Sequence, residues 1–346
     1  MKDITLADLG WSAHFSNQIT SDSLILTPPA RVCDIHRDRL VAITETGNIA
    51  LSLPPFISAG DLAVGDWILI DPDTNQVRTL LERRTTLTRQ AAGPSGGEQL
   101  IAANVDTLMI VTSCNSEFNP ARLERYIALA MGSGTFPVIV LTKADLTTET
   151  DDYKRQAERL SPLATVLAVN ARESEELVQL NAWLRVGETA ALVGSSGVGK
   201  STILNGLTGL DVSTQAIREN DEKGRHTTTS RSLRRTVTGG WLIDTPGVRS
   251  LGMSDSDAGI EQVFSDLLDL AAQCKFTDCA HETEHGCAVK AAIERGELEA
   301  DRLVRWQKLQ RENQYNSETI AQSRTRYKKF GRQIKSILSI KRQRTR

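Results

Sequence analysis

Residues 194–201 read GSSGVGKS, which is the strongest indication of a fold in this chain. They follow the apolar run AALV and precede TILNGL, which is typical of a helix. In a Gly-x4-Gly-Lys-Ser loop the glycines let successive backbone N–H groups point at phosphate oxygens, and the helix adds its positive end. We therefore expect this phosphate-binding loop to contact a nucleotide through Gly194, Ser195, Ser196, Gly197, Val198, Gly199, Lys200, Ser201 and Thr202.

Two further features complete the phosphate end of the predicted site. Lys200 would reach the β- and γ-phosphates, and the Ser201 hydroxyl would be a ligand of Mg²⁺. The sequence DTPG follows the apolar run WLI, so Asp244 at a strand end would hold the same ion through water. The N–H of Gly247 would sense the γ-phosphate. Lys200 and Gly247 are accordingly predicted to take part in catalysis.

The sequence TKAD at residues 142–145 predicts a guanine reader at the end of the apolar run VIVL. The carboxylate of Asp145 would accept from the ring N–H and the exocyclic amine of guanine, a donor pair that adenine lacks, so GTP is favoured over ATP. Lys143 would pack its stem along the ring. Thr142 stands where asparagine is usual, so one hydroxyl replaces an amide.

A second base loop is predicted at residues 169–172, which read VNAR. Here the N–H of Ala171 would meet guanine O6, while Asn170 replaces the usual serine. Both base loops precede the phosphate loop, whereas an ordinary GTPase has the reverse order. The sequence is therefore a circular permutation, which joins neighbouring termini and opens the chain elsewhere while leaving the sheet intact.

Residues 222–233 (EKGRHTTTSRSL) lie between the phosphate loop and DTPG and are predicted to order only with GTP. Thr228 is the expected ligand of Mg²⁺ and the γ-phosphate, with Thr227 and Thr229 as alternatives. Val248 occupies the position where many GTPases place a water-orienting glutamine, so slow intrinsic hydrolysis is expected. His226 is the predicted replacement; the alternative is that it contacts only solvent or RNA.

The chain is predicted to be multidomain, since 346 residues exceed one ordinary core. Short strands with period-two patterning suit a small barrel such as an OB-fold, and strands alternating with helices predict a largely parallel sheet with ligands at its carboxyl edge. The predicted parts are a flexible N-terminal extension (1–29), an OB-fold barrel (30–88), a linker (89–99), a circularly permuted α/β P-loop GTPase domain (100–255), an α-helical zinc-binding domain (256–315) and a basic tail (316–346).

Three thiols and one imidazole, Cys274, Cys279, His281 and Cys287, predict one structural Zn²⁺ site. His285 is a competing nitrogen ligand. A closed set of four ligands leaves no position for catalysis. Cys33 and Cys114 fall inside predicted strands and are expected to be small core residues.

Charge is unevenly distributed along the chain. Residues 301–346 hold 14 Lys and Arg against 3 Asp and Glu, whereas the whole chain has a net charge of −2. A basic end on an acidic body favours contact with a polyanion such as ribosomal RNA; the alternative is a solubilising tail. No run of 18 apolar residues and no secretory signal is found, so no membrane contact and a cytoplasmic location are expected.

The whole arrangement resembles the RsgA family of circularly permuted GTPases, also called YjeQ or YloQ. The resemblance rests on VGDWILI, NPARLERYIALA, LTKADL, LVGSSGVGKST, GRHTTT, DTPGVRSLG and CKFTDCAHETEHGC. It implies GTP hydrolysis to GDP stimulated by the 30S ribosomal subunit, late maturation of that subunit, and contact with 16S rRNA. It also favours His281 over His285 as the zinc ligand and His226 in hydrolysis.

Two other functions compete with a ribosome-activated GTPase. One is an RNA-binding scaffold whose nucleotide site is mainly structural, and hydrolysis assays with purified small subunits separate the two. The other is a metabolic or DNA-linked GTPase, which co-sedimentation with 30S subunits would discriminate. Nothing in the sequence points to a dimer, so a monomer is expected.

Overall fold

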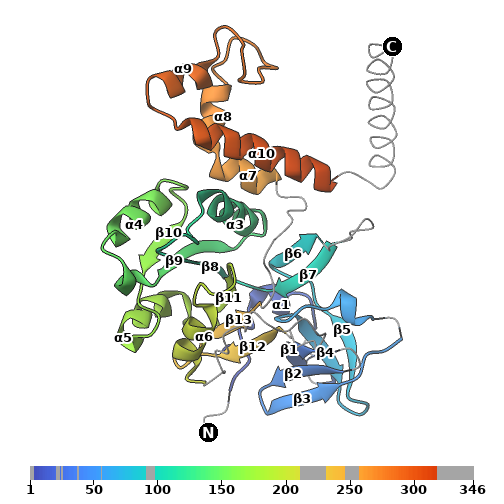
Figure 1. Cartoon of the computed structure of the whole chain (residues 1–346). Coiled ribbons are helices and arrows are strands. Elements are labelled where there is room, and N and C mark those ends of the chain that lie inside the picture. The colour runs from blue at the N-terminus through green and yellow to red at the C-terminus, as the bar shows by residue number, and fades with distance from the viewer. Residues whose placement is uncertain are drawn as a thin grey trace, which may run out of the picture.

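The computed structural model describes residues 4–20, 24, 26–36, 39–55, 57–90, 98–210, 231–245 and 257–317. A small β-barrel, a central α/β layer and a group of C-terminal helices follow one another in space (Figure 1). None of the described helices is both long and apolar enough to cross a bilayer.

The barrel is formed by β1 to β5. Strand β1 pairs antiparallel with β2 and β4, β2 pairs with β3, and β4 pairs with β5. A single parallel bridge between Ser52 and Gln76 joins the end of β3 to β5 and closes the ring. The strands are β1 (Pro29–Ile35), β2 (Leu40–Thr44), β3 (Gly47–Leu51), β4 (Trp67–Asp71) and β5 (Gln76–Leu80), with a 3-10 turn, η1 (Ala59–Asp61), between β3 and β4.

The N-terminal segment is docked, so the prediction of a flexible extension is wrong for residues 4–20. Leu9 and Phe15, the latter in the short helix α1 (Ala13–Ser16), are fully buried. Phe15 packs beside Trp67 of β4 with ring centroids 5.7 Å apart. Isolated anchors of this kind produce no sequence periodicity, which is why the pattern gave no sign of them.

One buried arginine ties the N-terminal segment to the other parts of the molecule. Arg31 of β1 donates to the carbonyl of Leu9 at 2.6 Å and to Thr189 Oγ1 of the α/β layer at 2.7 Å. Burial lowers the pKa of Arg31 to about 10. Its donors therefore join three segments far apart in sequence at one point.

The two ends of the predicted linker belong to the paired strands of a β-hairpin. Strand β6 (Thr86–Gln90) pairs antiparallel with β7 (Glu98–Ala103), and this pairing includes residues 89–90 and 98–99. The composition of residues 91–97, rich in glycine with one proline and one serine, suggested a linker. The flanking strands pair with each other, so the linker prediction is wrong where it included them.

The central layer has the predicted largely parallel sheet. Its strand order is β10-β9-β8-β11-β13-β12, and only β12 runs antiparallel, pairing with β13 and touching β1 of the barrel. The strands are β8 (Thr107–Ser113), β9 (Phe136–Thr142), β10 (Thr165–Ala168), β11 (Thr189–Val193), β12 (Ser232–Arg235) and β13 (Trp241–Asp244).

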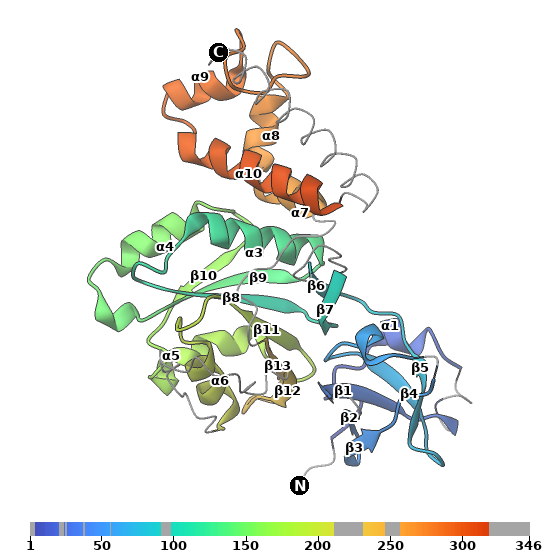
Figure 2. The same cartoon turned by 45° about the vertical axis from the view of Figure 1, so that its right-hand side comes forward.

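Helices cover both faces of this sheet. Helices α3 and α4 lie over one face, and α5 and α6 lie over the other (Figures 1 and 2). Their bounds are α3 (Pro120–Gly132), α4 (Thr150–Glu158), α5 (Ser174–Leu177) and α6 (Lys200–Thr208), with 3-10 turns η2 (Ala144–Leu146) and η3 (Val178–Trp183). Helix α3 begins with Asn119 as N-cap and Pro120 in the first turn.

The C-terminal helices pack on the outer side of α3 (Figure 2). They are α7 (Asp257–Val263), α8 (Ser265–Ala271), α9 (Ala288–Glu294) and α10 (Ala300–Ser317). Helix α3 is therefore covered on two sides, and it buries Glu124, Ala128 and Leu129 in addition to Leu123, Tyr126, Ile127 and Ala130. The residues on one side of α3 are buried against the sheet, and those on the other side are buried against α7 and α10.

Replacing Gly259 by alanine is expected to loosen this packing. A Cβ at Gly259 would lie 2.0 Å from the carbonyl oxygen of Ala128, which is helix backbone and cannot swing away. Overpacking of this kind costs about 1–3 kcal/mol. Limited proteolysis should therefore cut the C-terminal helices of Gly259→Ala faster than those of the parent chain. Gly60→Ala, where the nearest atom is the Ser58 hydroxyl at 3.5 Å, is the control and should leave the cleavage rate unchanged.

Candidate functional site

The phosphate-binding loop joins the central strand β11 to helix α6, as the sequence predicted. Gly194 has φ 144°, and a Cβ there would lie 2.1 Å from the carbonyl oxygen of Val111 in β8. Gly199, the N-cap of α6, has φ 99° in the left-handed region. Only glycine fits these two positions without strain, so the loop can turn its amides toward a ligand.

Lys200 closes the loop on itself in this structure. Its Nζ donates to the carbonyl oxygen of Gly194 at 2.8 Å and to that of Ser195. Asp244 ends the neighbouring strand β13, paired in register with Leu192 of β11. Burial raises the pKa of Asp244, and the charge of Lys200 acts in the opposite direction. A lysine and a carboxylate thus lie at one edge of the sheet, where a phosphate and a divalent cation would meet.

Thr142, which replaces the usual asparagine, contacts the phosphate loop directly. Its side chain is buried, and its Oγ1 lies 2.6 Å from the carbonyl oxygen of Val198 and 3.1 Å from that of Thr112. One hydroxyl can therefore tie strand β9 to the loop, as an amide at this position would. The departure from the usual motif leaves the link between base loop and phosphate loop in place.

The two predicted base loops leave adjacent parallel strands, β9 and β10. Lys143 has φ 57°, and the exposed Asp145 follows it in η2. In the second loop the N–H of Asn170 donates to Glu176 Oε2 at 2.7 Å, and Asn170 Oδ1 accepts from the N–H of Arg172 at 3.1 Å. Glu176 is thus a support of the second loop that the sequence pattern did not indicate.

Several predicted residues lie outside the part of the chain that the structure describes. They are the catalytic candidates His226 and Gly247, the switch threonines Thr227, Thr228 and Thr229, and Val248. Their roles stay predictions.

The four predicted zinc ligands come together between α8 and α9. The ligand atoms of Cys274, Cys279, His281 and Cys287 all lie within 4.8 Å of one another. His281 Nδ1 lies 3.4 Å from Cys287 Sγ and 3.7 Å from Cys274 Sγ, and the two sulfurs are 3.9 Å apart. A tetrahedron with Zn–S of about 2.3 Å and Zn–N of about 2.0 Å has edges of about 3.5–3.8 Å. The donor set and its spacing therefore fit Zn²⁺.

The remaining cysteines behave as predicted. Cys33 and Cys114 are buried in the protein core. Burial raises the pKa of each thiol to about 11, with the charge of Asp34 adding to the effect at Cys33. Neither thiol is therefore ionised near neutral pH, as expected of structural residues.

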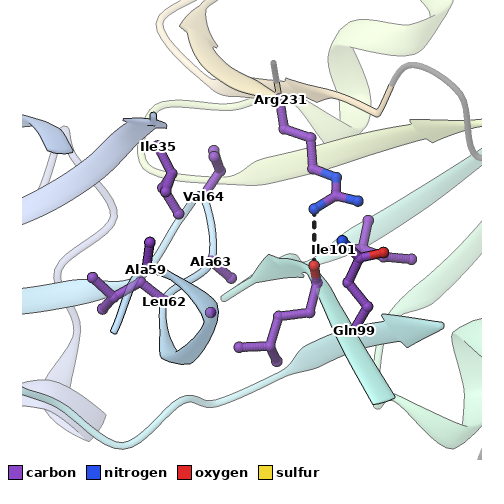
Figure 3. Close-up of a pocket in the computed structure, with 10 residues that line it drawn as sticks. Ile35, Ala59, Leu62, Ala63, Val64, Gln99, Ile101 and Arg231 are labelled. Atoms are coloured by element: carbon purple, nitrogen blue, oxygen red, sulfur yellow. Dashed lines mark hydrogen bonds between the residues drawn. The ribbon is translucent and has the colours of Figure 1, made fainter. Parts of the chain in front are cut away.

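A cavity of about 280 Å³ lies between the barrel and the β6–β7 hairpin (Figure 3). Arg231, the first described residue after residue 210, reaches into it and donates to the carbonyl oxygen of Leu100 at 2.9 Å. The lining residues are Ile35, Ala59, Gly60, Leu62, Ala63, Val64, Gln99, Leu100, Ile101 and Arg231. Of the residues predicted to bind nucleotide, none of those that the structure describes lines this cavity.

Sequence comparison assigns the family. The profile of the RsgA GTPase family matches residues 80–254. A "Small ribosomal subunit biogenesis GTPase RsgA" of Mesorhizobium japonicum is 50% identical over 317 residues, which cover 90% of this chain and 91% of that relative. The chain belongs to the RsgA GTPase family. A Vibrio parahaemolyticus relative, "Small ribosomal subunit biogenesis GTPase RsgA 2", is 46% identical over 340 residues and covers 98% of this chain and 94% of its own.

Solved structures agree with RsgA membership. YjeQ from Thermotoga maritima matches with a TM-score of 0.60 and 27% identity, over 82% of this chain and 97% of its own. YloQ, a circularly permuted GTPase, matches with a TM-score of 0.57 and 22% identity. The match covers 85% of this chain and 97% of the YloQ chain and shows a shared fold. The predicted family and permuted GTPase fold are confirmed. As an RsgA GTPase, this chain is a GTP-hydrolysing enzyme.

Sequence reasoning missed a charged network that joins the GTPase layer of this RsgA family member to its C-terminal helices. The buried Arg302 of α10 lies 3.1 Å from Glu124 of α3 and 2.8 Å from Asp266 of α8. Burial raises the pKa of Glu124, whereas Arg305 and Arg302 act to lower it. The excess of basic residues after residue 301 suggests a nucleic-acid surface. Two of these arginines, Arg302 and Arg305, instead face inward and pair with the buried Glu124.

Proposed function

We propose that the chain binds GTP at residues 194–201 and hydrolyses it on the small ribosomal subunit during late maturation of that subunit. The observation that carries the proposal is the closed phosphate loop, with Lys200 within hydrogen-bond reach of the loop carbonyls and Asp244 at the neighbouring strand end. The names of the Mesorhizobium and Vibrio relatives supply the ribosomal partner.

Each residue near the phosphates would have its own role. The loop amides and Lys200 would hold the β- and γ-phosphates, and Ser201 and Thr228 would be direct ligands of Mg²⁺, with Asp244 holding it through water. The magnesium ion would neutralise charge on the phosphates. The N–H of Gly247 would contact the γ-phosphate.

Guanine would be held by Asp145, Lys143 and the N–H of Ala171. Asp145→Asn is expected to weaken GDP binding about 10- to 100-fold, because an amide donor would then face a guanine donor and a charged hydrogen bond is lost. Xanthosine diphosphate, which carries an oxygen in place of the amine, should bind the variant better than the parent chain. Fluorescence titration with both nucleotides measures this. Asp151→Asn on the exposed face of α4 is the control, and equal GDP affinity in Asp145→Asn would refute the assignment.

Hydrolysis with purified 30S subunits tests the proposed function. Because Val248 cannot orient water, we expect slow turnover alone and turnover raised many-fold by subunits. Binding to subunits without added turnover would favour the scaffold, and failure to co-sediment with them would favour another GTPase class.

The same assay tests His226, which we propose orients the attacking water. In single-turnover reactions with subunits, His226→Ala is expected to slow hydrolysis about 10²-fold or more. His285→Ala, an exposed histidine near the zinc cluster, is the matched control and should keep the parent rate. A subunit-stimulated rate of His226→Ala equal to that of the parent chain would remove His226 from the mechanism.

The other parts of the chain would serve binding. We propose that Cys274, Cys279, His281 and Cys287 hold one structural Zn²⁺. The ring order of the barrel, β1-β2-β3-β5-β4, supports an OB-fold, and with the basic tail it would contact 16S rRNA. We propose that the protein acts in the cytoplasm, together with its ribosomal partner, and that it acts as a monomer.

A further inference from the structure

The first turns of helix α3 contact the phosphate loop on one side. Arg122 NH1 donates to the hydroxyl of Ser195, and the carbonyl of the same Ser195 accepts from Lys200 Nζ. Arg122 also lies 3.4 Å from Glu117, in the loop that leads into α3. One arginine outside the loop motif therefore holds the loop residue that Lys200 contacts.

The same two turns of α3 hold helix α10 on the other side. Glu124, whose side chain is only 1% exposed, lies 3.1 Å from Arg302 NH1 and 2.7 Å from Arg305 Nε. Arg125 forms an ion pair with Glu312, which lies about two turns beyond Arg305 along α10. A buried carboxylate that loses its cations is left uncompensated, so α10 is held firmly at this point.

The connection between the two sides is short and stiff. Arg122 and Arg125 are three residues apart in a continuous helix, so they are neighbours on its surface, whereas Glu124, two residues after Arg122, lies on the opposite face of the same turn. The side chain of Asn119 caps this turn by accepting from the N–H of Arg122 at 2.9 Å. A displacement of α10 that moves this turn must also move the guanidinium at Ser195.

We propose that Arg122 is a positioning residue of the phosphate loop, and that docking of α10 on Glu124 and Arg125 sets its position. The proposal rests on the function proposed above, in that residues 194–201 are taken to bind GTP. When a nucleotide enters, Lys200 must exchange the carbonyls of Gly194 and Ser195 for phosphate oxygens. Arg122 then keeps Ser195 in place, so the loop retains its shape as Lys200 leaves.

A consequence is that the C-terminal helices and the nucleotide influence each other. If docking of α10 favours the loop geometry that binds nucleotide, nucleotide must favour docking of α10 by the same factor. A partner that pulls on the zinc-bearing helices would thereby change nucleotide affinity through α3.

The test is a double-mutant cycle on GDP affinity, measured with a fluorescent GDP analogue on the full chain. Arg122→Met and Ser195→Ala are each expected to weaken GDP about tenfold, and the double variant should be no weaker than either alone. Arg122→Lys should recover part of the loss. Arg155→Met, in an exposed ion pair on α4, is the matched control and should keep the parent affinity.

The link to α10 is tested with Arg305→Met. It should weaken GDP about threefold in the parent chain and have no further effect in Arg122→Met. Glu312→Gln, which removes the partner of Arg125 without leaving a buried charge, gives the same test if Arg305→Met fails to fold. Arg311→Met is the control, because Arg311 is exposed and its Nε donates to the carbonyl of Gln307 within α10 itself.

Two results would overturn the proposal. One is parent-like GDP affinity in Arg122→Met, and the other is strictly additive losses of Arg122→Met with Ser195→Ala or with Arg305→Met. Either result leaves the proposed GTPase function intact as long as the parent chain binds GDP. Absence of GDP binding by the parent chain would instead reject the proposed function itself.

Discussion

Replacing Lys200 by alanine is expected to lower kcat/KM for GTP by about 10²–10³-fold. Nζ is the one charged donor of the loop itself, and in this structure it already lies within reach of two loop carbonyls. In the transition state it would stabilise charge developing on the β- and γ-phosphates. The measurement is phosphate release, alone and with 30S subunits.

Matched controls separate this effect from loss of structure. Lys154→Ala removes a lysine from α4, away from the phosphate loop, and should keep the parent rate. The melting temperature of Lys200→Ala is measured as well, so that lost turnover with an unchanged melting temperature reports on catalysis and not on folding. Full turnover by Lys200→Ala would contradict the proposal that Lys200 binds the phosphates of GTP.

Cys287→Ser is expected to reduce bound zinc from one ion per chain to nearly none and to unfold the region around α8 and α9. Structural Zn²⁺ contributes about 10–16 kcal/mol to the folding of small zinc peptides, so loss of one ligand removes a large share of local stability. Cys287 is buried and also begins α9, where its sulfur accepts from the N–H of Lys290. Metal analysis and hydrogen exchange over residues 265–294 measure the two effects.

His285→Ala is the matched control for the metal site. His285 is exposed, and the cluster of ligand atoms contains His281 instead. The variant should retain one zinc ion per chain, and its hydrogen exchange over residues 265–294 should equal that of the parent chain. Loss of zinc from His285→Ala, or full zinc retention by Cys287→Ser, would show that the ligand set is wrong.

The two sites were predictable from sequence because their groups are close along the chain. The phosphate loop is eight residues long, with glycines at the two positions that only glycine fits, and the four zinc ligands lie within 14 residues. The apolar runs VIVL, AALV and WLI were likewise enough to predict β9, β11 and β13.

Contacts between distant segments were not predictable in this way. Arg122 and Ser195 are 73 residues apart, and Arg302 and Glu124 are 178 apart. A charged residue in a helical pattern suggests an exposed face, so Glu124 gave no sign that it is buried. Likewise, the N-terminal segment has no periodicity, and its docking depends on the surfaces of the barrel and the α/β layer.

Short motifs were enough to predict the family, the permuted order of the nucleotide motifs and the metal donor set, because backbone geometry and ligand chemistry act over a few neighbouring residues. The contact between Thr142 of β9 and the phosphate loop, the packing of both sides of α3 and the inward-facing arginines of α10 become visible only in the folded chain. These outcomes depend on which surfaces meet, and partners for buried charges are found only after the sheet and helices have packed.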